Sequence, residues 1–117
     1  MISEISNRQV YLACGSTDLR KSIDGLAVLV KETFALDPFS PCLFVFCNRK
    51  RDKIKILQWD HNGFWLHYRR LERGKFDWPT AKTDVINISY REFRWLLDGL
   101  SVKQNQAHKA VKQRTIL

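Results

Sequence analysis

The sequence has few of the residues that hold small secreted domains together. Its 117 residues include three cysteines, Cys14, Cys42 and Cys47, at uneven spacing, so we expect reduced thiols rather than a disulfide framework. No segment approaches the ~20 apolar residues of a membrane span. The N-terminus also lacks the basic region and the apolar run of a signal peptide. These absences predict a cytoplasmic protein that does not enter membranes.

The motifs of common catalytic and cofactor sites are missing as well. Gly15-Ser16-Thr17 precedes an expected helix, but neither G-x-x-x-x-G-K-[ST] nor G-x-G-x-x-G is present. No Asp or Glu is followed two residues later by Lys, so the D/E-x-K element of many nucleases is absent. Cys42, Cys47, His61 and His67 loosely resemble a zinc finger, but each pair has odd spacing, which in strands points its members to opposite faces. We therefore expect a binding protein, not an enzyme, with no metal and no cofactor.

Acidic residues are scarce relative to basic ones. Twelve Asp and Glu stand against twenty Lys and Arg, giving a net charge of +8 and a pI near 9.7. Residues 48–75 alone carry +6 of that charge. Such an excess indicates an anionic partner, most commonly nucleic acid, with an ordinary solvated surface as the alternative. The nine cations of this segment are Arg49, Lys50, Arg51, Lys53, Lys55, Arg69, Arg70, Arg73 and Lys75.

The same region carries the strongest strand signals. Residues 43–79 predict a three-stranded β-meander with cations at its turns and strand ends. Asn62-Gly63 favours a two-residue type I′ turn, because both central positions of that turn need positive φ. This register would place Lys55 opposite Arg70. Like charges in that arrangement are unfavourable unless the strands twist apart, Glu72 relieves the pair or an anion binds there.

Two amphipathic helices are predicted on either side of the meander. Residues 17–36 have apolar positions at steps of three or four, and Ser16 or Thr17 is suited to cap the helix. Residues 89–99 open with a Ser-x-x-Glu capping box and place apolar residues on one stripe.

Together these elements predict an α+β fold in a single domain over residues 1–100. We expect an antiparallel sheet of four or five strands, with the three-stranded meander at its centre and the two helices flanking it. Short β-rich runs at 9–14 and 85–88 supply further strands whose order in the sheet stays open. Residues 101–117 contain four cations and no acid, which predicts a basic, mobile C-terminal tail.

The residues alone suggest a nucleic-acid surface on the meander. The nine cations of residues 48–75 would bind phosphates, with an affinity that falls steeply as salt rises. Trp65 or Tyr68 would stack on bases. For any single aromatic residue, a place in the core between the sheet and the helices is the alternative.

Several motifs resemble the second-open-reading-frame protein of insertion sequence sixty-six elements, the accessory protein called TnpB in that family. The resemblance covers roughly residues 10–100 in the right order. Ser22, Pro41 and Cys47 depart from the family pattern without removing a recognised functional residue. The matching stretches are Gly15–Lys21, Ile23–Leu26, Asp37–Phe39, Leu43–Phe46, Asn48-Arg49, Lys55–Leu57, Trp59-Asp60, Gly63–Leu66, Arg70–Phe76, Trp78-Pro79 and Leu96–Gly99.

The resemblance implies a role in transposition of a bacterial mobile element, beside a separate, larger transposase that carries the catalytic acids, and it implies no biochemical activity of its own. Three hypotheses remain open. The chain contacts element DNA through its basic meander, or it is an adaptor that binds the transposase or another accessory protein through exposed aromatics. The third is a small nuclease, which carboxylates converging on the basic face would support.

Overall fold

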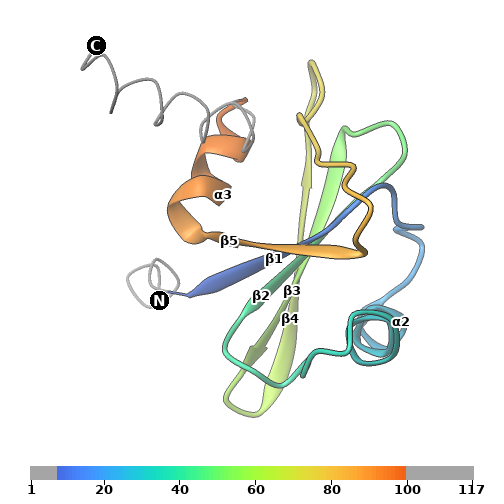
Figure 1. Cartoon of the computed structure of the whole chain (residues 1–117), viewed down its shortest axis with the longest axis vertical. Coiled ribbons are helices and arrows are strands. Elements are labelled where there is room, and N and C mark those ends of the chain that lie inside the picture. Colours follow the sequence, from blue (N-terminus) through green and yellow to red (C-terminus); the bar gives the residue numbers. More distant parts are fainter. Residues whose placement is uncertain (1–7, 100–117) are drawn as a thin grey trace.

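The computed structural model describes residues 8–99 as one five-stranded sheet with helical segments on both of its faces (Figure 1). The predicted α+β class is confirmed. The predicted tail, residues 101–117, lies outside the described residues. In chain order the elements are β1 (Gln9–Ala13), α2 (Ile23–Val28), the π-helical turn η1 (Leu29–Thr33), β2 (Leu43–Cys47), β3 (Lys53–Asp60), β4 (Gly63–Arg70), β5 (Val85–Ser89) and α3 (Tyr90–Leu97).

The sheet is mixed rather than antiparallel. Its strand order is β4-β3-β2-β1-β5, and the predicted meander forms its β2, β3 and β4 part, with antiparallel neighbours. Strand β1, however, runs parallel to β2, with Val10 opposite Leu43. A parallel pair needs a crossover connection, and the helical segment α2–η1 supplies it. The purely antiparallel prediction is therefore wrong at this one pairing. The meander also lies at one side of the sheet, with β4 as an edge strand, and not at its centre as predicted, because β1 and β5 both add on the side of β2.

Helix α2 begins later than predicted. It starts at Ile23 with Ser22 as its N-cap, and the side chain of Ser22 makes no capping hydrogen bond. The predicted caps, Ser16 and Thr17, lie before a turn instead. Within that turn the Asp18 carboxylate accepts the backbone N–H two residues further on, at 3.0 Å. This local hydrogen bond competes with helix formation and delays the helix.

Helix α3 follows its prediction closely. The hydroxyl of Ser89 accepts the backbone N–H of Glu92 at 3.0 Å, and the Glu92 carboxylate accepts the backbone N–H of Ser89 at 3.0 Å. The capping box is thus complete. Gly99 has the positive φ, 93°, that its place after the helix C-terminus requires.

The β3–β4 turn is shifted by one residue from the predicted position. Asp60 pairs with Gly63, so His61 and Asn62 are the central residues, and His61 takes the positive φ of 62°. The predicted facing of Lys55 and Arg70 is therefore wrong. Because the turn moved by one residue, each residue of β3 now pairs with the β4 residue two positions before the predicted one. A shift of two positions keeps every side chain on the predicted face of the hairpin.

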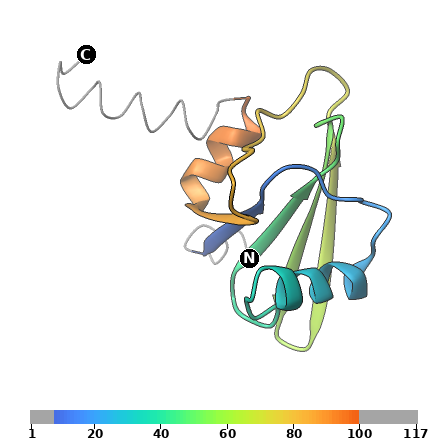
Figure 2. The same ribbon diagram turned by 45° about the vertical axis from the view of Figure 1, so that its right-hand side comes forward.

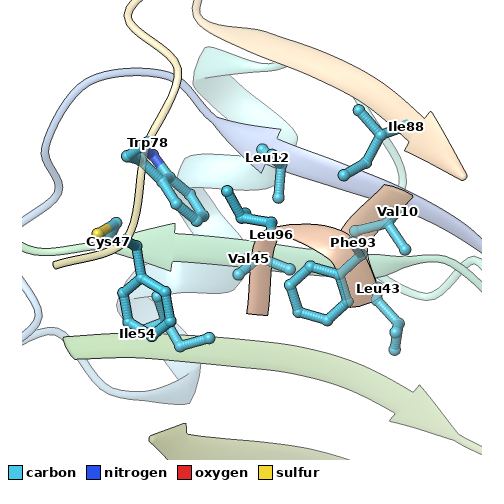
Figure 3. Packing of buried hydrophobic residues seen from close by; sticks show 11 residues of the cluster. Val10, Leu12, Leu43, Val45, Cys47, Ile54, Trp78, Ile88, Phe93 and Leu96 are labelled. Carbon is cyan, nitrogen blue, oxygen red and sulfur yellow. The ribbon is translucent and has the colours of Figure 1, made fainter. Parts of the chain in front are cut away.

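Each face of the sheet carries its own hydrophobic core, and β2 is buried from end to end between them. Figure 2 shows the two helices on opposite sides of the sheet. Alternate residues of β2 and β3 supply the two cores, as the pleat requires. The α2 side contains Ala13, Leu26, Val30, Phe44, Phe46 and Leu57. The α3 side, shown in Figure 3, contains Val10, Leu12, Leu43, Val45, Cys47, Ile54, Phe76, Trp78, Ile88, Phe93 and Leu96.

Candidate nucleic-acid interface

Two cationic loops far apart in the sequence are fastened together at one end of the sheet. The backbone N–H of Leu71 donates to the carbonyl of Asp52, and the N–H of Phe76 donates to the carbonyl of Arg51, each at 2.7 Å. The β2–β3 turn and the segment after β4 therefore lie side by side (Figure 1). We call the cations of these two loops the basic tip: Arg49, Lys50, Arg51, Arg73 and Lys75.

Buried aromatic residues anchor the second of these loops. Phe76 and Trp78 belong to the core on the α3 side. The indole N–H of Trp78 donates to the carbonyl of Ala13 at 2.8 Å, which ties the segment after β4 to the far strand β1. The basic tip is thus held by buried, hydrogen-bonded side chains, although the segment that carries them contains no regular secondary structure.

Asn48 organises the first of the two loops. Its side-chain oxygen accepts the backbone N–H groups of Asp52 and Lys53, at 3.1 and 3.0 Å. Its side-chain amide donates to the Asp52 carboxylate at 2.7 Å. This hydrogen bond, followed by the charge of Lys53, lowers the pKa of Asp52. Arg51 takes a positive φ of 63° inside the turn.

The cations of the tip lack the carboxylate partners that Lys53 and Arg70 have in the neighbouring strands. Lys53 lies 3.6 Å from the Asp52 carboxylate, and Arg70 lies 2.9 Å from that of Glu72. The ion pair with Glu72 raises the pKa of Arg70. Within residues 8–99, no such ion pair involves a cation of the basic tip. The tip charges are therefore open to an external anion, unlike those of Lys53 and Arg70.

A pair of like charges does face across the β3–β4 ladder, but it is not the predicted pair. Lys53 lies opposite Arg70, and Lys55 lies opposite Tyr68. Asp52 and Glu72 each pair with one member of the Lys53–Arg70 pair, and this relieves the repulsion. Of the explanations open from the sequence, the structure favours relief by neighbouring acids, including Glu72.

Lys55 has an internal role that its sequence position did not reveal. Its ammonium donates to the carbonyls of Leu19 and Lys21, at 2.6 and 3.2 Å, and so holds the loop before α2. This contact also brings Arg20 to the basic face, a residue that sequence reasoning missed. The signal that could have found it was the strand–helix–strand order of residues 9–47, which predicts a crossover over this face.

Arg69 is separated from the other predicted cations by the alternation of β4. It points to the α3 side, where it borders a groove of about 250 Å³ between the sheet and α3. Gln58 and His67 lie in the same groove and hydrogen bond to each other at 2.8 Å. The nine predicted cations therefore do not form one surface. Five lie at the tip, three on the α2 face and one on the α3 face.

The two candidate stacking residues lie on opposite faces of β4. Trp65 is 52% exposed on the α3 side, where its ring stacks on His67 and its indole N–H donates to Asp60 at 3.0 Å. Tyr68 is 55% exposed on the α2 side, beside the cations of β3. Both remain available to a ligand, but a single flat ligand cannot cover both.

The two cysteines of the loose zinc-finger pattern are divided between the two cores, while His61 is exposed at the β3–β4 turn and His67 lies in the groove on the α3 side. Cys47 is buried on the α3 side, while Cys42 packs against the core on the α2 side. Burial raises the pKa of the Cys47 thiol to about 12. In the part of the chain that the structure describes, no three His, Cys, Asp or Glu side chains gather in a way that could hold a metal ion.

None of the helices among the described residues has the length and apolarity needed to cross a membrane.

Comparison with known proteins gives one family and two relatives of the same size. The model of the family described as IS66 Orf2 like protein matches residues 8–107. The chain is 36% identical over 106 residues to the uncharacterized protein y4hO of Sinorhizobium fredii, which covers 91% of this chain and 92% of that protein. It is 32% identical over 100 residues to the uncharacterized protein y4jC of the same organism, covering 86% of each. No solved structure gives a significant match.

Proposed function

Because the chain belongs to the IS66 Orf2-like family, which indicates a role in insertion sequence transposition, we propose that it is a non-catalytic accessory protein that contacts element DNA. The contact is made through phosphates and is centred on the basic tip. Lys53, Lys55 and Arg70 extend the positive surface along the α2 face of β3 and β4, whereas Arg69 lies on the other face.

The observation that carries the proposal is the joining of the two cationic loops. Two backbone hydrogen bonds place the turn with Arg49 and Lys50 beside the segment with Arg73 and Lys75. Without a ligand, concentrating like charges in this way is electrostatically unfavourable. A DNA backbone carries its negative charges at short intervals, and neutralising them releases condensed counterions. The tip therefore has the charge density that phosphate binding uses.

The test is DNA binding by a charge-reversed tip. Arg49→Glu, Lys50→Glu and Arg73→Glu together change exposed side chains without a hydrogen-bonded partner in the structure, so the fold should be retained. Fluorescence anisotropy with an element-end duplex and a scrambled duplex, each over a salt series, should show binding by the native protein. The triple variant should lose it.

A charge-matched control separates the tip from the net charge. Lys31→Glu, Arg91→Glu and Arg94→Glu also reverse three exposed cations, but these lie on η1 and α3 rather than on the two joined loops. This control should retain most of the DNA affinity. Unchanged affinity in the tip variant, with circular dichroism showing an intact fold, would contradict the assignment.

A second candidate function, an adaptor that binds the element's transposase or another accessory protein, is favoured by one aromatic cluster. Phe39, Trp59 and Phe64 contact one another with ring centroids 4.9 to 5.4 Å apart. Phe39 is 56% exposed, as the anchor of a protein interface must be before binding. The cluster lies toward the β3–β4 turn, at the other end of the hairpin from the basic tip.

The adaptor function is tested by co-purification with the transposase. Phe39→Ala should abolish the association, while Val28→Ala, at another exposed apolar residue, should leave it unchanged. Association that survives both changes would exclude this cluster as the interface.

A further inference from the structure

An open cleft of about 560 Å³ lies on the α2 face of the sheet, next to the basic tip. It is formed where the loop before α2 crosses over β3 and β4. Its walls combine three cations, one carboxylate and one exposed aromatic ring: Arg20, Lys53, Lys55, Asp18 and Tyr68. Its volume falls within the ~300–1,000 Å³ range of small-ligand sites.

The ammonium of Lys55 is held in this cleft without a counter-ion. Its two hydrogen bonds go to backbone carbonyls, at 2.6 and 3.2 Å. Among residues 8–99, no carboxylate oxygen lies within ion-pair distance of it. An ammonium has three N–H donors, so one remains for a ligand. A half-buried cation that is balanced only by carbonyl dipoles attracts an anion.

The other charges of the cleft are arranged around this lysine. Asp18 is bound by two nitrogens of the Arg20 guanidinium, at 2.8 and 3.0 Å. Those hydrogen bonds lower the pKa of the Asp18 carboxyl below its ordinary value. The carboxylate offsets Arg20, and Asp52 lies 3.6 Å from Lys53. Lys55 is thus the uncompensated charge that would position an anionic group.

Tyr68 gives the cleft its second recognition element. It lies directly opposite Lys55 in the β3–β4 ladder, and the residue is 55% exposed. An aromatic ring beside an uncompensated cation matches one nucleotide, since the ring stacks on the base and the ammonium binds the phosphate. An acidic peptide would use the cation but would leave the ring without a flat partner.

We propose that this cleft binds one unpaired nucleotide, with its phosphate on Lys55 and its base on Tyr68. The inference rests on the proposed DNA contact and specifies its substrate as DNA with an unpaired segment or a strand end. The cleft shares Asn48 and Lys53 with the turn that carries Arg49 and Lys50. A strand leaving a duplex bound at the tip would therefore enter it directly. A free nucleotide has the same chemistry and is the other source to be distinguished.

The test compares a blunt duplex, the same duplex with a short unpaired tail, and the tailed duplex with deoxyadenosine monophosphate as competitor. The native protein should prefer the tailed duplex.

Tyr68→Ala should reduce the affinity for the tailed duplex about tenfold and leave the affinity for the blunt duplex unchanged. Tyr68→Phe should retain the preference because the ring remains. Lys55→Gln removes the charge while leaving a neutral amide donor on a shorter side chain, and should also reduce the preference.

The matched control is Trp65→Ala, because Trp65 is the other exposed aromatic of β4 and faces away from the cleft. This variant should behave like the native protein.

Equal affinity of the native protein for blunt and tailed duplexes would overturn the proposal. A loss of affinity for the tailed duplex with Trp65→Ala but not with Tyr68→Ala would overturn it as well. Duplex binding through the tip would survive either result, so failure here is distinct from failure of the DNA contact. If the mononucleotide competes with the tailed duplex, the cleft also binds free nucleotides. If it does not compete and the tailed duplex is still preferred, the ligand of the cleft is the unpaired strand of DNA.

Discussion

At the scale of single residues, Lys55 links a strand to a loop that lies more than thirty positions earlier in the sequence. Its ammonium occupies the carbonyls of Leu19 and Lys21, which a helix beginning near Thr17 would have used for its own hydrogen bonds. The start of α2 at Ile23 is thus set partly by a side chain of β3. This contact could not be predicted from local sequence.

The first prediction is that Lys55→Met destabilises the protein by about 1–3 kcal/mol, because two backbone carbonyls lose a charged donor. Lys53→Met is the matched control, since Lys53 extends from the same face of β3 and makes only the 3.6 Å pair with Asp52. The control should cost no more than about 1 kcal/mol. Urea unfolding of both variants measures the difference, and equal losses would show that the loop contact contributes little.

The second prediction concerns Cys47 and alkaline pH. Burial raises the pKa of this thiol from 9.0 to about 12, so the folded state holds a proton that the unfolded state releases. The sign follows directly. The stability linked to this group is complete below pH 9.0 and is lost as the pH rises toward about 12, by roughly 1.4 kcal/mol per unit.

Cys47→Ala isolates this effect from the other groups that titrate at high pH. The variant should be less stable at neutral pH, because it leaves a small void in the core on the α3 side. Its stability should then fall less steeply than that of the native protein above pH 9.0. Parallel curves in urea unfolding over this range would mean that the thiol is not protected from ionisation.

At the scale of elements, the two helices begin in physically different ways. The N-terminus of α3 is stabilised by side chains next to it in sequence, whereas that of α2 has no side-chain cap and is placed by tertiary contacts. The third prediction uses this contrast. Ser89→Ala should destabilise the protein by about 1 kcal/mol, because a backbone N–H at the start of α3 loses its acceptor.

Ser22→Ala is the control for the same substitution at the N-cap of α2, where the side chain makes no capping hydrogen bond. It should change the free energy of unfolding by less than about 0.5 kcal/mol. Thermal or urea unfolding measures both variants. A larger loss at Ser22 than at Ser89 would contradict the capping geometry described for the two helices.

The same contrast explains how much of the fold could be predicted. The capping box, the three-stranded meander and the strand runs near 9–13 and 85–89 are local patterns, and the structure confirms them. The parallel pairing of β1 with β2 depends on where α2–η1 returns the chain, which local periodicity does not encode. The shifted turn shows that Asn-Gly is a preference only, since His61 holds the positive φ instead.

The candidate site was predictable in composition but not in arrangement. Charge counting identified the nine cations of residues 48–75, and the tip cations Arg49 and Arg73 do lie on neighbouring loops. Their distribution over a tip and two faces depends on strand register and on hydrogen bonds between distant segments. Arg20 was missed because only the crossover brings it to Lys55. Whether these residues bind DNA stays a prediction.

At the scale of the whole molecule, a local cluster of cations and a large net charge predict different salt responses. A net charge of +8 attracts any polyanion at a distance. Salt screens this attraction, and its strength depends little on where the charges lie on the protein surface. Contacts made by the tip instead neutralise individual phosphates, and each one adds about −0.9 to the slope of log affinity against log salt. The salt slope therefore distinguishes the two sources of affinity.

The fourth prediction is that neutralising the tip lowers this slope, whereas neutralising other cations does not. Arg49→Gln, Lys50→Gln and Arg73→Gln together should reduce the magnitude of the slope by about three, roughly one for each lost phosphate contact. Lys31→Gln, Arg91→Gln and Arg94→Gln, on η1 and α3, remove the same net charge and should lower the affinity slightly at an unchanged slope. Anisotropy titrations over a salt series give both slopes. If the two triple variants change the slope equally, binding follows the charge of the whole molecule, and the joined loops have no special part in it.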